Sequence, residues 1–164
     1  AFPLRTLAQA TALRNHILQQ FEQATRERDP QRRQQLLTFV IVGGGPTGVE
    51  MAGTLVELKR AVRRDYPGLS WQEMQIILVQ SGDNLLANLP DRLGRYTTRK
   101  LRQLGVKVHF QTRVSRVTEQ AVEFQSCQLA LSSGQPDSKP PCPPRRRTYL
   151  LLANASWRCD RRCN

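Results

Sequence analysis

Apolar residues follow a helical period over the first quarter of the chain. From 7 to 24 they recur at helical spacing, with Arg and Gln on the other face. Thr6 followed by Gln9 is typical of a capping box, which starts such a helix. The polar stretch 29–35 predicts its end. This amphipathic helix is expected to pack against the edge of the fold or against a neighbouring domain.

Two short apolar runs then predict strands. Residues 39–42 form a β-branched run that leads through glycines into a helix expected at about 46–64. A connector separates this helix from the run 75–80, in which residues 76–79 are all apolar. Continuous apolarity is typical of a parallel strand that is buried on both faces. Both runs therefore predict an α/β fold.

The pattern continues to Phe124. Asp91 begins another predicted helix, which Gly105 ends as a C-terminal cap. Val106, Val108 and Phe110 alternate as expected in a third strand, and residues 114–124 suggest an antiparallel hairpin with its turn near 119–120. The predicted order is therefore βαβαβ followed by a β-meander.

The last quarter of the chain differs in composition. Residues 126–164 are rich in Ser, Pro, Arg and Cys, and apart from 149–153 they offer little to bury, so this tail is predicted to be largely disordered. Its composition also resembles an out-of-frame translation. We therefore divide the chain into an N-terminal helix and linker (1–36), a central domain (37–125) and the tail (126–164).

The chain is strongly basic, with a net charge of +12 from 25 basic and 13 acidic residues. A basic surface can attract nucleic acid, anionic lipid or a phosphate-bearing cofactor, but a solvated basic face is the simplest interpretation. One face of the predicted helix that begins at Asp91 is also basic. A solvated face is its first interpretation, and contact with an anionic membrane surface is the second. This face carries Arg92, Arg95, Arg99, Lys100 and Arg102.

The apolar runs and the positions of the cysteines argue against two kinds of feature, a membrane-spanning helix and a metal site. No run of 18 apolar residues exists, which argues against a membrane-spanning helix. All four cysteines lie in the tail, and the pair Cys159 and Cys163 has no second pair or nearby histidine, so no metal site is expected. The Cys-free body indicates a reducing compartment.

A glycine motif lies between the first predicted strand and its helix. The pattern Gly43-x-Gly45-x-x-Gly48 is the phosphate-binding turn of a Rossmann-like dinucleotide fold, although other α/β folds also contain glycine-rich turns. Gly43 permits a tight turn, Gly45 leaves the backbone open to a pyrophosphate, and Gly48 permits close packing. The helix N-terminus then faces the phosphates with unpaired N–H groups.

Residues 3–124 resemble the type II NADH dehydrogenases, which are NADH:quinone oxidoreductases of the two-dinucleotide-binding flavoprotein superfamily. The resemblance rests on residues 3–17, which include Leu13-Arg-Asn-His-Ile17, on the glycine segment 42–53, and on residues 76–80 and 96–110. The glycine segment fits the whole superfamily, whereas the preceding helix favours this branch. Another flavoprotein disulfide or ferredoxin reductase is the nearest alternative.

The resemblance implies a set of cofactor-binding residues. The glycine turn, including Gly44 and Pro46, would hold the pyrophosphate of NADH or NADPH. Thr47 would donate to a phosphate or simply occupy the first helical turn. Glu50 would lie near the nicotinamide, or would be an ordinary carboxylate that the helix dipole favours. No catalytic residue is assigned, because hydride transfer to a flavin needs positioning and no acid or base.

Gln80 departs from the family pattern, in which an acidic residue binds the adenosine ribose. A neutral hydrogen bond is worth about 0.5–1.5 kcal/mol, against about 1.5–3 for a charged acceptor, so NADH binding should weaken several-fold. The missing carboxylate would also make the extra phosphate of NADPH tolerable. No Arg follows within 81–89 to bind that phosphate, although Arg60, Arg63 or Arg64 could fold back to it, so the preference between the cofactors stays open.

The resemblance also implies properties of a complete protein. FAD would bind in a second domain that this chain lacks, and a quinone would accept the electrons. Such a protein would be cytoplasmic and peripheral to the inner or plasma membrane, would not bind nucleic acid, and could be a homodimer. This chain by itself is expected to be inactive. The alternative from another class is a non-enzymatic module that binds a dinucleotide or a polyanion.

Overall fold

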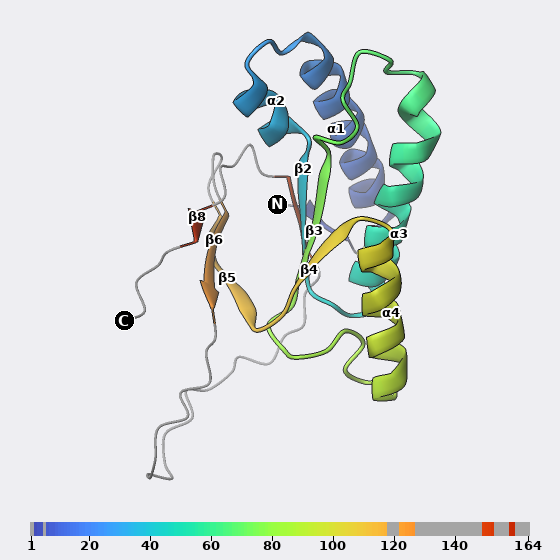
Figure 1. Cartoon of the computed structure of the whole chain (residues 1–164), viewed down its shortest axis with the longest axis vertical. Helices are drawn as coiled ribbons and strands as arrows, with labels where there is room; N and C mark the ends of the chain where they lie inside the picture. The colour runs from blue at the N-terminus through green and yellow to red at the C-terminus, as the bar shows by residue number, and fades with distance from the viewer. Residues whose placement is uncertain (1, 5, 118–121, 127–148, 153–157, 160–164) are drawn as a thin grey trace.

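The computed structural model describes residues 2–4, 6–117, 122–126, 149–152 and 158–159, which form three layers (Figure 1). A five-stranded sheet lies between a layer of helices and a three-stranded sheet. The helices are α1 (Leu7–Arg26), α2 (Pro30–Leu36), α3 (Pro46–Ala61), the short 3-10 helix η1 (Val62–Arg64) and α4 (Asp91–Gln103). The strands are β1 (Phe2–Pro3), β2 (Thr38–Val42), β3 (Gln75–Val79), β4 (Val106–His109), β5 (Thr112–Val117), β6 (Val122–Ser126), β7 (Tyr149–Leu152) and β8 (Arg158–Cys159).

The main sheet confirms the predicted parallel βαβαβ unit. Its strand order is β1-β7-β2-β3-β4, and β2, β3 and β4 run parallel. Ile77 of β3 pairs with Val40 of β2 on one side and with Lys107 of β4 on the other. Because β3 has partners on both edges and layers on both faces, four of its five residues are buried. The carboxyl ends of the three strands therefore meet at one edge of the sheet.

The N-terminal helix begins where the capping pattern predicts. Thr6 Oγ1 accepts a hydrogen bond from the amide of Gln9 at 3.2 Å, and α1 then runs to Arg26. The first helix ends before the polar stretch 29–35, as predicted, but that stretch forms a helix of its own that was not predicted. Asp29 caps a second helix, α2, by accepting from the amide of Gln31 at 3.0 Å. Proline suits the first position of α2 because it lacks the N–H that a helix start leaves unpaired.

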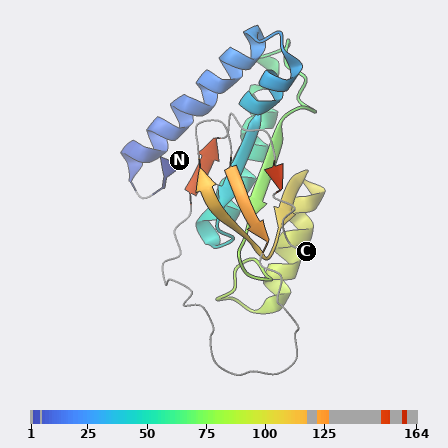
Figure 2. The ribbon, with the colours of Figure 1, turned by 90° about the vertical axis from the view of Figure 1, so that its left-hand side faces the viewer.

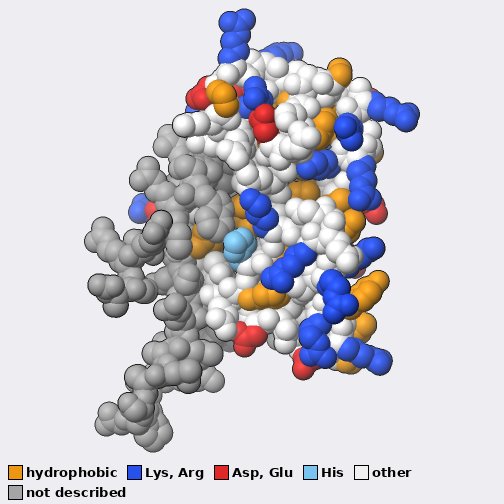
Figure 3. Space-filling view, viewed as in Figure 1, with side chains coloured by type: hydrophobic (Ala, Val, Ile, Leu, Met, Phe, Trp, Pro, Cys, Tyr) orange, Lys and Arg blue, Asp and Glu red, His pale blue; other side chains and the backbone are white. Residues whose placement is uncertain are grey.

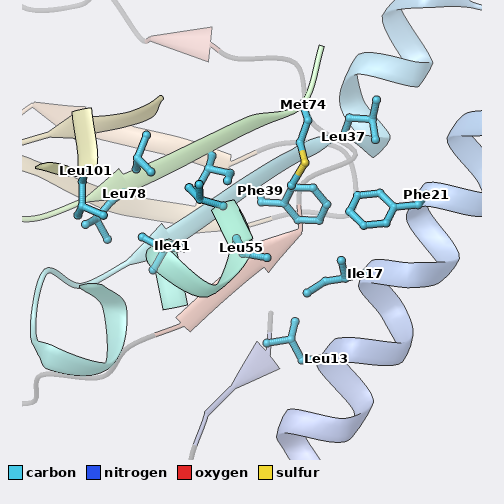
Figure 4. Close-up of a cluster of buried hydrophobic side chains, with 14 of the residues drawn as sticks. Leu13, Ile17, Phe21, Leu37, Phe39, Ile41, Leu55, Met74, Leu78 and Leu101 are labelled. Carbon is cyan, nitrogen blue, oxygen red and sulfur yellow. The ribbon is translucent and has the colours of Figure 1, made fainter. Parts of the chain in front are cut away.

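Two apolar clusters cover the two faces of the sheet. The larger cluster packs α1, α3 and α4 against the helix-facing side, with Phe21 in edge contact with Phe39, 5.9 Å between ring centroids (Figure 4). The smaller cluster lies under the β5–β6 hairpin, where Val122 and Phe124 cover Ile77 and neighbouring valines. The hairpin was predicted as a meander, and its packing explains why β3 is apolar on both sides.

The C-terminal strands were not predicted in this form. Backbone pairing places β7 between β1 and β2, antiparallel to both, while β8 pairs parallel with β6 (Figure 2). Residues 149–153 were the exception allowed in the tail, and the two-residue strand β8 was not predicted. The predicted turn at 119–120 and the Pro-rich part of the tail lie outside the described residues. So do all the cysteines except Cys159.

Candidate functional site

The glycine turn lies at the carboxyl ends of β2 and β3. Gly43 has φ +106°, a conformation that favours glycine, and its amide donates to the carbonyl of Val79 at 2.8 Å. The chain therefore leaves β2 in a tight turn while still bonded to β3. This confirms the predicted conformational role of Gly43.

The next two glycines of the motif occupy opposite environments. A Cβ built on Gly48 would lie 1.9 Å from the carbonyl oxygen of Gly43, whereas one built on Gly45 would meet nothing within 4 Å. Gly48 is thus required for the start of α3 to pack on the turn. Gly45, the N-cap of α3, leaves an open approach to the backbone. Such an opening is what a diphosphate needs in order to reach the helix N-terminus.

Gln80 makes a contact that the sequence did not indicate. Its side-chain Oε1 accepts a hydrogen bond from the amide of Gly44 at 2.9 Å, and its Nε2 donates to the carbonyl of Asn84 at 3.4 Å. Gly44 is buried, and a Cβ there would meet the Leu85 side chain at 2.5 Å. Gln80 therefore ties the glycine turn to the segment that follows β3.

The remaining predicted residues lie at the start of α3. Pro46 occupies the first turn, and Pro46, Thr47 and Glu50 are all exposed. The first helical hydrogen bond runs from the amide of Val49 to the carbonyl of Gly45 at 3.0 Å. Since Pro46 has no N–H, the amides of Thr47 and Gly48 are the ones that a helix start leaves for a ligand. The structure thus brings all eight predicted residues to one turn and its borders, while their roles toward a cofactor stay predictions.

The segment between β3 and α4 completes the edge of the site. The amide of Leu86 donates to the carbonyl of Gly44 at 2.8 Å, and Gln111 Nε2 donates to Asp83 Oδ1 at 2.8 Å. These bonds hold the segment between the glycine turn and the end of β4. Sequence reasoning missed Asn84 and Leu85, since nothing in their local pattern indicates contact with the glycine turn.

A hollow of about 570 Å³ opens beside this segment on the side of α4. It is lined by Asn84, Arg95, Thr98, Arg99, Arg102, Gln103 and Phe110. The guanidinium of Arg102 lies over the Phe110 ring, 5.9 Å from its centroid. Three arginines of the basic helical face thus line a concave surface, which the sequence alone did not show.

Among the described residues, none of the helices combines the length and the apolar character that a membrane span requires.

Comparisons with known proteins identify the family of the chain. The profile of the pyridine nucleotide-disulphide oxidoreductase family matches residues 2–137. The type II NADH:quinone oxidoreductase Ndh of Mycobacterium tuberculosis is 35% identical over 120 residues, which are 73% of this chain and 26% of that protein. The external alternative NAD(P)H-ubiquinone oxidoreductase B1 of Arabidopsis thaliana is 34% identical over 122 residues, 73% of this chain and 21% of that protein.

A solved structure supports the fold. NDH2 from Plasmodium falciparum, in complex with NADH, superposes with a TM-score of 0.73 at 23% identity, over 77% of this chain and 26% of that one. The chain spans about a quarter of the length of the curated relatives from Mycobacterium tuberculosis. By its family profile, the chain belongs to the pyridine nucleotide-disulphide oxidoreductases, and type II NADH:quinone oxidoreductases are among the proteins that it resembles.

Proposed function

We propose that this chain is the NAD(P)H-binding part of a flavin-dependent NAD(P)H:quinone oxidoreductase and that the turn Gly43–Gly48 holds the cofactor pyrophosphate. The open space beside Gly45, at the start of a helix whose third residue Gly48 is packed on the turn, carries the proposal. A pyrophosphate there would accept hydrogen bonds from the amides of Thr47 and Gly48 and lie at the positive end of the helix dipole.

The other residues would position the two ends of the dinucleotide. Glu50, one turn into α3 and exposed, would lie toward the nicotinamide. Gln80 would hold the turn through Oε1 and present its Nε2, which has only a 3.4 Å contact to Asn84, to the adenosine ribose. These roles would need no proton transfer by the protein, because bound NAD(P)H would supply a hydride for FAD held in another part of the protein, and from there electrons for a quinone.

The complete protein would act at a membrane surface. Its relatives are named as NADH:quinone and NAD(P)H-ubiquinone oxidoreductases, and quinones are membrane-dissolved acceptors. We therefore place it as a peripheral protein on the cytoplasmic side of the inner or plasma membrane, with FAD held by another part of the protein. A homodimer is compatible with this arrangement.

Cofactor titration of matched glycine variants tests the proposal. Gly45→Val places a branched side chain in the open approach and should abolish binding of NADH and NADPH. Gly53→Val is the control, because Gly53 lies two turns further along α3 and a Cβ there also meets nothing within 4 Å. Binding would be measured by calorimetry and folding by circular dichroism. Equal binding by the two variants would refute the proposed site.

A further inference from the structure

The hollow beside α4 is built mainly by one face of that helix. Arg95, Arg99 and Arg102 follow one another at spacings of four and three residues, so their side chains project to the same side. Figure 3 shows Lys and Arg side chains gathered over the region of α4. Phe110, the residue after β4, forms an aromatic wall of the hollow, and Asn84 closes it toward the glycine turn.

Within the described part of the chain, no carboxylate forms an ion pair with the arginines of this hollow. The ion pairs there join Arg32 to Glu27 and Arg33 to Glu73, and neither involves α4. None of the described residues that line the hollow is acidic, and Arg102 contacts the Val108 carbonyl at 3.4 Å and the Phe110 ring. The neighbouring His109 is also affected by these charges. Burial first, and then the charges of Lys107 and Arg102, lower its pKa.

Phosphate is the anion that this arrangement suits. Guanidinium groups bind phosphate oxygens with paired, charge-assisted hydrogen bonds, and several arginines on one face can share one phosphate. Thr98, Gln103 and Asn84 add neutral polar groups to the lining. A volume of about 570 Å³ holds a phosphorylated sugar or nucleotide portion as well as a single ion.

The hollow borders the proposed dinucleotide site at Asn84. Gln80 Nε2 donates to the carbonyl of Asn84, and Asn84 lines the hollow. Gln80 also bonds the glycine turn, so one side chain connects the two regions. A phosphate carried on the adenosine ribose beside Gln80 would therefore lie on the side of the arginines.

We propose that Arg95, Arg99 and Arg102 form a phosphate-binding site for the 2′-phosphate of NADPH, an inference that rests on the proposed function. The arginines that supply charge to this phosphate then come from α4 and not from the segment directly after β3, which contains none. The site makes NADPH a better ligand than NADH and makes that preference dependent on salt, because the arginines are exposed.

Paired titrations with NADPH and NADH test this site. The variant Arg95→Gln/Arg99→Gln should weaken NADPH binding about tenfold, as two partly exposed charge contacts do together, and change NADH binding less than about twofold. The control Arg92→Gln/Lys100→Gln removes the same charge from α4 at residues that do not line the hollow. It should leave the ratio of the NADH dissociation constant to the NADPH dissociation constant unchanged. Added salt should lower that ratio in the wild type and in this control alike, and much less in Arg95→Gln/Arg99→Gln.

Different outcomes separate the two proposals. If NADH binds and Gly45→Val abolishes it, but the arginine variant leaves NADPH binding unchanged, only the 2′-phosphate site is overturned. If neither cofactor binds the wild type, the proposed function fails as well. Flotation with equimolar phosphatidylcholine and phosphatidylglycerol vesicles tests the other source of phosphate. If Arg95→Gln/Arg99→Gln loses vesicle binding but keeps the wild-type preference for NADPH, the arginines bind a lipid headgroup and the proposal is overturned.

Discussion

Two glycines three residues apart differ completely in their tolerance of a methyl group. Gly48→Ala would place its Cβ against the backbone carbonyl of Gly43, which cannot rotate away, so overpacking should cost about 1–3 kcal/mol of unfolding free energy. Gly45→Ala adds a methyl group in open space and should cost less than about 1 kcal/mol, the usual range for an N-cap change. Urea denaturation measures both. Equal losses would show that the turn relaxes around Gly48.

Gln80 gives a second prediction for a single residue. Gln80→Leu leaves the buried amide of Gly44 without its acceptor and should cost about 1–3 kcal/mol, whereas Gln80→Glu keeps an oxygen at the same position. Hydrogen exchange at Gly44 distinguishes the variants directly. We expect fast exchange in the leucine variant and slow exchange in the glutamate variant. Slow exchange in both would mean that the hydrogen bond does not hold the turn.

These residues show how far sequence reasoning reaches at a site. The role of Gly43 as a tight turn and of Gly48 in close packing followed from the motif, because both demands are steric and local to the turn. The partner of Gln80 did not follow. A terminal amide at the end of a strand can reach a ligand or a neighbouring backbone, and only the distance to Gly44, 36 residues away in sequence, decides between them.

At the scale of elements, one ion pair connects α2 to the connector before β3. Arg33 Nε and Nη2 donate to the two carboxylate oxygens of Glu73 at 2.8 and 3.0 Å. The hydrogen bond from Arg33 holds the pKa of Glu73 below its usual value. The folded state thus binds the proton less tightly than the unfolded state does. The stabilisation is present above the unfolded pKa and is lost as the pH falls through the folded pKa.

The corresponding prediction concerns acid stability. Glu73→Gln should have a lower Tm than the wild type at pH 7. The difference should shrink as the pH falls below the pKa of an unfolded glutamate and through the lower pKa of folded Glu73. Glu57→Gln, at an exposed position of α3, is the control and should stay parallel to the wild type. Thermal melts between pH 3 and pH 7 measure this. A pH-independent difference for Glu73→Gln would exclude the ion pair as its cause.

The same ion pair explains why α2 was not predicted. Its sequence, Pro-Gln-Arg-Arg-Gln-Gln-Leu, has no apolar period of its own and buries only Leu36. The helix depends on the cap at Asp29 and on a contact made 40 residues away by Arg33. In contrast, α1 and α4 carry their own apolar periods and terminal signals, and their ends were predicted closely.

At the scale of the whole molecule, the sheet depends on a strand from the C-terminal part of the chain. Val40 of β2 pairs with Leu151 of β7, and Leu150 pairs with Phe2 of β1. Leu151→Pro removes a backbone N–H from this pairing and should lower Tm and speed hydrogen exchange in residues 38–42. Leu151→Ala keeps the N–H and is the control. Equal effects of the two variants would show that backbone pairing of β7 does not stabilise the sheet.

The parallel core of the sheet could be predicted, whereas the placement of β7 could not. The strands β2, β3 and β4 follow one another through helices, so their order and direction follow from short right-handed connections. The run Tyr149–Leu152 was noted as apolar, but its direction and neighbours depend on pairing with strands more than a hundred positions earlier. Local periodicity holds no information about such a partner.

The insertion of β7 has a consequence for synthesis on the ribosome. The three parallel strands can assemble while the nascent chain is still growing, since their contacts close short loops early. Among the described strands β1 pairs only with β7, so its pairing must wait until that much later part of the sequence has been made. Until then one border of β2 presents unpaired amides and carbonyls. That interval is when a chaperone, or a neighbouring nascent chain, would meet this protein.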